Sequence, residues 1–185
     1  MRNSSFRAAA VAALACAHWG AHAALLVFDN LPLVQHQYEL GGLSDVRTDI
    51  YDKGFRLVYA PAEGEQYPTG IFWVGPKWRF NGKSVAATIN SCLGSLTITR
   101  EDNNPFGIDG IDLATLNGDP SASVTFVGVT LDGQTVTETA QVGPAMQWSR
   151  HRFSSSFSRL QSLTWRQGDC FVNMPHMFDN VELTY

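Results

Sequence analysis

The chain has 185 residues, of which 16% are charged and 44% hydrophobic, and its formal net charge is −4. This length and composition predict one domain that is large enough to bury its own core. The acidic balance argues against a nucleic-acid partner, because proteins of that class need a basic surface for the phosphates.

The first 23 residues have the pattern of a cleavable secretory signal. Arg2 and Arg7 precede an apolar run of about ten residues, far shorter than the ~20 that cross a bilayer as a helix. Small residues end the segment at Ala21 and Ala23, so we expect cleavage before Ala24 and a single mature domain over 24–185. Loss of the two signal arginines takes the formal charge from −4 to −6.

Cys16 leaves a second interpretation of this segment open, because lipoproteins are cut before a cysteine that then carries lipid. The nearest leucine is Leu14, one position closer to the cysteine than such a site normally has it. We therefore expect a protein with no lipid anchor, either secreted or periplasmic.

Short runs that alternate apolar and polar residues follow the signal, separated by Gly, Pro, Asn and Asp. This two-residue period is typical of β-strands, and no window shows a convincing helical period. The clearest hairpin joins 124–131 to 134–140 through Asp132-Gly133, a pair that suits a type I′ turn. The strands we expect cover residues 55–59, 71–74, 78–80, 84–86, 96–99, 108–116, 124–131, 134–140, 160–165, 170–173 and 181–185.

Many short strands at this spacing predict an all-β fold, a two-sheet antiparallel β-sandwich of the jelly-roll type. A closed up-and-down barrel is the alternative. The uneven turn spacing between residues 29 and 70 favours a sandwich with one long irregular crossing.

Cys92 and Cys170 are the two cysteines left after the signal. Export places them in an oxidising compartment, where disulfides persist, so we predict that they are bonded to each other. A pair of buried free thiols is the alternative.

Several short segments follow one another in a recognisable order, at 27–32, 53–57, 105–114, 124–128, 160–165 and 178–183. Their order resembles that of PEP-CTERM-associated proteins, which are secreted bacterial β-sandwiches similar to carbohydrate-binding jelly rolls. No Pro-Glu-Pro motif follows Tyr185, so membrane sorting through such a tail is not expected. The resemblance implies the fold and a polysaccharide or cell-surface glycan as partner.

A Phe-Asp-Asn motif occurs twice, at residues 28–30 and 178–180, near the two ends of the mature chain. In the jelly-roll modules that this chain resembles, acidic residues of the first and last strands often share a structural calcium. Asp29 and Asp179 are the ligands that this resemblance implies, and calcium prefers such oxygen ligands. Asx-turns at the two strand entries explain the same residues without a metal.

Aromatic residues with polar neighbours are candidates for sugar binding, because flat rings pack against pyranose faces. Trp73, Trp78 and Trp148 lie in such segments, although packing in the sandwich interior would also account for each of them. Trp165, in an apolar run, is expected in the core.

Residues able to support catalysis are sparse. His36, His151 and His176 are scattered, and the acidic stretches at 63–65 and 101–104 have the pattern of solvated loops. The basic run 150–152 suits either an anionic glycan or a solvated strand face. We therefore predict an exported, non-catalytic binding or extracellular-matrix module, with calcium as its one cofactor. The alternative is a polysaccharide-active enzyme, a glycosidase or lyase, on the same fold.

Overall fold

The computed structural model describes residues 23–28, 47–64, 70–74, 85–89, 94–115, 121–144, 147–166 and 176–185, except for the side chains of 73–74 and 85–89. These residues form strands and one short 3-10 helix, η3 (Ser155–Phe157). The strands are β1 (Ala23–Leu26), β2 (Asp49–Asp52), β3 (Phe55–Ala60), β4 (Gly70–Val74), β5 (Val85–Ile89), β6 (Ser95–Arg100), β7 (Gly107–Thr115), β8 (Ala122–Thr130), β9 (Thr135–Val142), β10 (Ser149–Arg152), β11 (Leu160–Arg166) and β12 (His176–Thr184).

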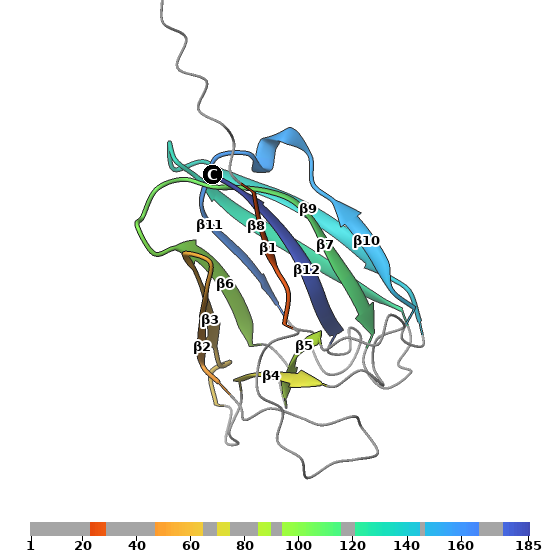
Figure 1. Ribbon diagram of the computed structural model, residues 1–185. Helices are drawn as coiled ribbons and strands as arrows, with labels where there is room; N and C mark the ends of the chain where they lie inside the picture. Colours follow the sequence, from red (N-terminus) through yellow and green to blue (C-terminus); the bar gives the residue numbers. More distant parts are fainter. Residues whose placement is uncertain are drawn as a thin grey trace, which may run out of the picture.

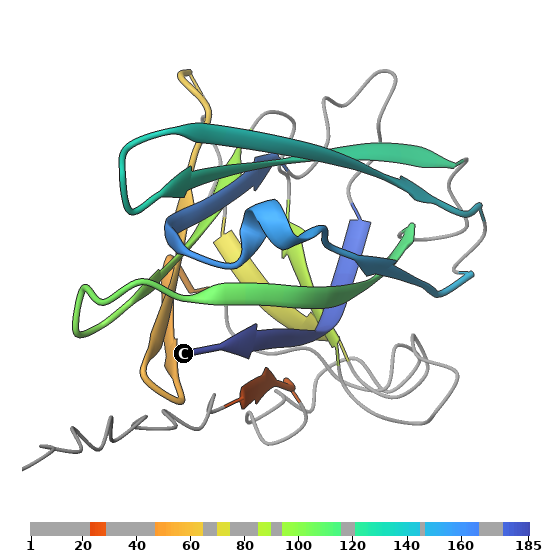
Figure 2. The ribbon, with the colours of Figure 1, turned by 90° about the horizontal axis from the view of Figure 1, so that it is seen from above.

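The strands pair into two six-stranded antiparallel sheets, seen from two directions in Figures 1 and 2. Sheet A has the order β10-β7-β12-β5-β4, and β1 also pairs with β12. Sheet B has the order β2-β3-β6-β11-β8-β9. The predicted two-sheet antiparallel β-sandwich, or jelly roll, is confirmed.

The core lies between the sheets and follows from the two-residue period of the strands. In β3, Phe55, Leu57 and Tyr59 are buried while the residues between them are not. Trp165 of β11 is 1% exposed, and its ring centroid lies 5.6 Å from that of Phe126 and 5.5 Å from that of Phe178. Because Phe178 belongs to β12, Trp165 joins sheet B to sheet A, and its predicted place in the core is confirmed.

The predicted hairpin of β8 and β9 forms, but its turn differs from type I′. Only Gly133 in this turn has positive φ, at 77°, whereas type I′ needs two such residues. Gly133 N donates to Thr130 O (2.9 Å), and Thr130 N donates to Gln134 O (2.9 Å). The loop is therefore a type I turn closed by a glycine bulge, since Asp132 keeps the ordinary negative φ.

The two ends of the described chain lie together in sheet A. Residues Ala23 to Leu26 of β1 pair with Thr184 to Val181 of β12. The ring centroids of Phe28 and Phe178 are 5.4 Å apart at 85°, an edge-to-face contact. The first residues of the two Phe-Asp-Asn motifs are thus in contact: Phe28 lies two residues after β1, and Phe178 lies in β12.

Several predicted residues lie outside the described ranges: Asp29, His36, Glu65, Trp78, Cys92, Cys170 and the strand at 170–173. The disulfide and the signal cleavage therefore stay predictions. Within the described ranges, no helix is long and apolar enough to span a bilayer.

Candidate functional site

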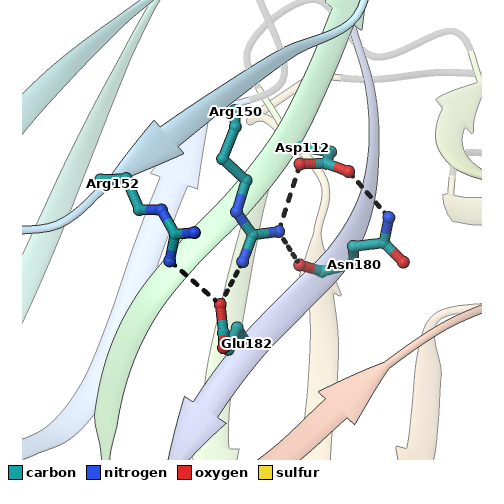
Figure 3. Close-up of polar contacts among 5 residues, drawn as sticks. All are labelled: Asp112, Arg150, Arg152, Asn180 and Glu182. Atoms are coloured by element: carbon teal, nitrogen blue, oxygen red, sulfur yellow. Dashed lines mark hydrogen bonds and ion pairs between the residues drawn. The ribbon is translucent and has the colours of Figure 1, made fainter.

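Polar side chains from three neighbouring strands meet on the outer face of sheet A (Figure 3). We call them the Arg150 cluster: Asp112 of β7, Arg150 and Arg152 of β10, and Asn180 and Glu182 of β12. They lie on this face because the alternating residues Ile111, Leu113, Phe178, Val181 and Leu183 turn inward to the core.

A bulge in β12 brings the cluster together. Asp179 pairs with Asp112 and Glu182 pairs with Gly110, so three steps along β12 match two along β7. Asn180, at the extra residue, has a φ of 46°, a value that Asn adopts more readily than most residues. The bulge turns the Asn180 carbonyl and side chain toward β7 and β10, where both make hydrogen bonds of the cluster.

Arg150 is the centre of the cluster. Its Nη1 donates to Asp112 Oδ1 (3.2 Å) and to the Asn180 carbonyl (2.8 Å), and its Nη2 donates to Glu182 Oε2. Arg152 Nη1 reaches the same Glu182 oxygen at 3.3 Å. Asn180 Nδ2 donates to Asp112 Oδ2 at 2.7 Å, which links the two ends of the network.

Gly110 makes room for the Arg150 guanidinium across β7. A Cβ at this position would lie 2.7 Å from Arg150 Nε and 2.8 Å from its Nη2, closer than real contacts allow. Any other residue would therefore displace the guanidinium. Gly110 thus allows the Arg150 guanidinium to lie against β7.

The cluster is held in place yet remains open to solvent. The side chains of Asp112 and Arg150 are 17% and 26% exposed, Glu182 is 35% exposed, and Arg152 is 70% exposed. Ion pairs at such exposure stabilise a fold by only about 1 kcal/mol each. Their main physical effect is to fix planar donor and acceptor groups in one orientation.

The predicted basic run 150–152 divides between the two faces of β10. Arg150 and Arg152 face outward, whereas His151 packs inward on Phe126 (ring centroids 5.7 Å apart) and Phe153 (4.7 Å). Burial lowers the pKa of His151, and Glu138, whose Oε2 is 4.0 Å from its Nε2, opposes that shift. His151 is therefore a packing residue on the inner face of β10, and of this run only Arg150 and Arg152 belong to the solvated face.

The two predicted tryptophans within the described ranges, Trp73 and Trp148, lie in or next to different strands. Trp73 lies in β4 opposite Ala86 of β5, and Trp148 directly precedes β10. Because β4 and β10 are opposite edges of sheet A, these two positions belong to separate parts of that sheet. Trp148 is half-buried and lies two residues before Arg150, so it is the predicted aromatic next to the cluster in the chain.

Asp179, one of the predicted calcium ligands, is 2% exposed and pairs with Asp112 across β7 and β12. In the part of the chain that the structure describes, no three His, Cys, Asp or Glu side chains group closely enough to hold a metal. The calcium prediction thus depends on Asp29 and other ligands beyond those residues.

The predicted acidic loops lie away from the cluster. Glu63 is exposed on a turn. Glu101 and Asp102 are exposed beside an open hollow of about 180 Å³, which Arg100 and Tyr185 also line. Asp102 accepts hydrogen bonds from Asn104, which lower its pKa, and pairs with Arg100. These carboxylates are solvated loop residues, as expected.

Asp112, Asn180 and Glu182 are site residues that the sequence reasoning did not select as ligand-binding. Asp112 and Glu182 lie in segments that were predicted as strands, where polar residues at alternate positions are typical of a solvated face, and Asn180 was part of the second Phe-Asp-Asn motif. The signal that was present is the spacing Asp109-Gly110-Ile111-Asp112, with a glycine next to an outward carboxylate. It becomes informative only once β10 is placed beside β7.

No protein-family model matches this chain, and no curated protein does. Solved structures of carbohydrate-binding modules have a similar fold. They include the CBM22-1 xylan-binding domain from Paenibacillus barcinonensis Xyn10C (14% identity, 68% of this chain and 83% of that one, TM-score 0.45). A mutant of CBM29-2, a family 29 carbohydrate-binding module, has 7% identity over 89% of this chain and 92% of its own, with a TM-score of 0.46.

A family 11 carbohydrate-binding module from Clostridium thermocellum, solved with a beta-1,3-1,4-mixed-linked tetrasaccharide, has 10% identity, covers 74% of this chain and 94% of its own, and has a TM-score of 0.40. Identities and TM-scores of this size do not carry a binding property from those modules to this chain. The chemistry of the Arg150 cluster has to stand on its own residues.

Proposed function

We propose that this protein is an exported, non-catalytic carbohydrate-binding domain, and that the Arg150 cluster contacts the glycan. The observation that carries the proposal is the open array of planar donors and acceptors across β10, β7 and β12. Sugars present neighbouring hydroxyl groups that both donate and accept. Guanidinium, carboxylate and amide groups can each bond two such hydroxyls at once.

Arg152 is the group best placed to meet a ligand, because it is 70% exposed and holds one contact of 3.3 Å. The Arg150 guanidinium, held at both ends by Asp112 and Glu182, provides the fixed base of the site. A preorganised array loses little side-chain entropy when a ligand binds. Trp148, which precedes β10, is proposed as the aromatic contact at one side of the array.

Three further features of the proposal are export, the Cys92–Cys170 disulfide and a structural calcium at Asp29 and Asp179. The contact between Phe28 and Phe178 supports the calcium feature, because the two proposed ligands directly follow these residues. A bound calcium predicts a melting temperature that falls on chelation and recovers when calcium is added. An unchanged melting temperature in excess chelator would refute a stabilising calcium.

A glycan array that covers neutral and uronic-acid oligosaccharides tests the binding function. The wild-type mature domain should bind a defined set of glycans, and Arg152→Ala should weaken that binding by about tenfold, the loss of roughly 1.4 kcal/mol. Arg159→Ala is the matched control, because Arg159 is an exposed arginine just before β11, bonded through its carbonyl to Leu131 of the β8–β9 hairpin. Equal losses in both variants, or no bound glycan, would refute the proposal.

A polysaccharide-active enzyme is the second candidate, because two carboxylates, Asp112 and Glu182, converge on Arg150. Retaining and inverting glycosidases both place two carboxyl groups on either side of the bond that they cleave. Here the Arg150 guanidinium occupies the space between the two groups, which favours binding over hydrolysis. The test is incubation with a polysaccharide that binds on the array. Release of reducing sugar or unsaturated product that Glu182→Gln abolishes would favour an enzyme over a binding domain.

A further inference from the structure

The outer face of sheet B carries side chains in regular rows. One row of residues crosses all six strands in printed register: Thr137 of β9, Val127 of β8, Thr164 of β11, Thr97 of β6, Val58 of β3 and Asp49 of β2. Each of these residues is exposed or half-buried. Their chain neighbours Phe126, Leu163, Trp165, Leu96 and Ile98 face the core.

The rows on either side continue this pattern over β9 and β8. Thr135, Val129 and Ser162 form one neighbouring row, and Thr139 and Thr125 belong to the other. Over β9 and β8 these rows present Thr and Val, and the central row carries its one charge at Asp49, on the edge strand β2. Arg166 of β11 and Arg56 of β3 lie in the rows on either side. Adjacent rows are about 6.7 Å apart along a strand, and adjacent strands are about 4.8 Å apart.

The side chains of this face, which we call the Thr/Val face, are rigid. Thr and Val branch at Cβ, which restricts χ1 and leaves little rotamer entropy to lose on binding. The Oγ1 atoms of Thr97 and Thr164 are 2.9 Å apart, and those of Thr125 and Thr139 are 3.1 Å apart, so the hydroxyls bond in pairs across strands. In each pair one proton and several lone pairs remain for an outside partner.

We propose that the Thr/Val face is a second binding surface, which adsorbs this domain to a neutral, insoluble polysaccharide whose chains lie side by side. The central row is uncharged from β9 to β3, and such a row fits a partner without charge, in a chain whose overall net charge is −4. Rows of hydroxyl and methyl groups that repeat in two directions match a surface that also repeats. The ligand class, a carbohydrate, rests on the proposed function. The surface is a different one, and its ligand is an insoluble polysaccharide rather than a soluble glycan.

Pull-down with microcrystalline cellulose and with crystalline chitin tests the proposal. The wild-type domain should be retained on at least one of them, and Thr164→Lys and Thr137→Lys should each weaken retention by at least about tenfold, because a lysine would place a charge against a neutral surface. Thr137 lies on the exposed edge strand β9, so its variant keeps the test valid if Thr164→Lys fails to fold. Gln134→Lys, in the hairpin turn, adds the same charge away from the face and should be retained.

The same variants separate this proposal from the first one. Arg152→Ala should lose soluble glycans on the array yet stay bound to the insoluble polysaccharide, whereas Thr164→Lys should do the reverse. No retention of the wild-type domain on either solid, or equal retention of all variants, would overturn the second surface. A dimer in size-exclusion chromatography that Thr164→Lys converts to a monomer would also overturn it, because a second copy would then occupy the face.

Discussion

The buried histidine of β12 makes a sharp prediction about stability and pH. His176 is 1% exposed, and burial lowers its pKa from 6.5 to about 3, because desolvation penalises the charged imidazole. In the unfolded chain the same group titrates near its ordinary value. The unfolded state therefore takes up this proton at a higher pH than the folded state does.

The sign and size follow from this difference. Because the pKa of His176 is lower in the folded state, the free energy of unfolding is highest above about pH 6.5 and falls as the pH falls toward 3. Between pH 7 and pH 5 the loss is about 2 kcal/mol, which is a substantial part of the 5–15 kcal/mol typical of a domain. No comparable loss is expected between pH 7 and pH 8.

Urea unfolding of the wild-type domain and of His176→Gln at pH 7, 6 and 5 measures this effect. The quantity to compare is the change in unfolding free energy with pH, since the substitution itself alters stability at every pH. Between pH 7 and pH 5, the unfolding free energy of His176→Gln should fall by about 2 kcal/mol less than that of the wild-type domain. His151→Gln, at a half-buried histidine, should show most of the wild-type decrease. The same pH dependence in wild type and His176→Gln would refute the reasoning.

Three glycines give further predictions. Gly128→Ala should cost about 1–3 kcal/mol in urea unfolding, because its Cβ would lie 2.8 Å from Leu160 Cδ2; a neutral result would mean that the core relaxes there. Gly133→Ala should cost about 1–2 kcal/mol with no steric contact, since its φ is 77°, and an unchanged stability would contradict the turn. Gly110→Val should weaken glycan binding by displacing Arg150, although it removes no polar group; full affinity would exclude the Arg150 cluster as the site.

The sequence predicted the strands whose inward residues are large and alternate. β3, β6, β8 and β11 agree with their predicted ranges to within about two residues. β10 was not among the predicted strands, because Ser149–Arg152 has no apolar residue, and a solvated strand face was only one of two interpretations of the run 150–152. β12 begins at His176, five residues earlier than predicted, because the bulge near Asn180 shifts the phase of the alternation.

The candidate site was harder to predict than the fold for a related reason. Arg150 and Arg152 were visible as a basic run in an acidic protein, but their partners Asp112 and Glu182 are far away in the chain. Their contact depends on β10 pairing with β7 and on a one-residue bulge in β12. Neither leaves a periodic signal, so the pairing of charges could be read only from the register.

The guanidinium of Arg150 organises the proposed glycan site, and Arg150→Lys separates the effect of its planar shape from that of its charge. Lysine keeps the positive charge but loses the planar fork that joins Asp112, the Asn180 carbonyl and Glu182. In isothermal titration with the glycan that binds best on the array, we expect a Kd at least about tenfold higher for the variant than for the wild-type domain. An unchanged Kd in a folded variant would contradict this role of Arg150.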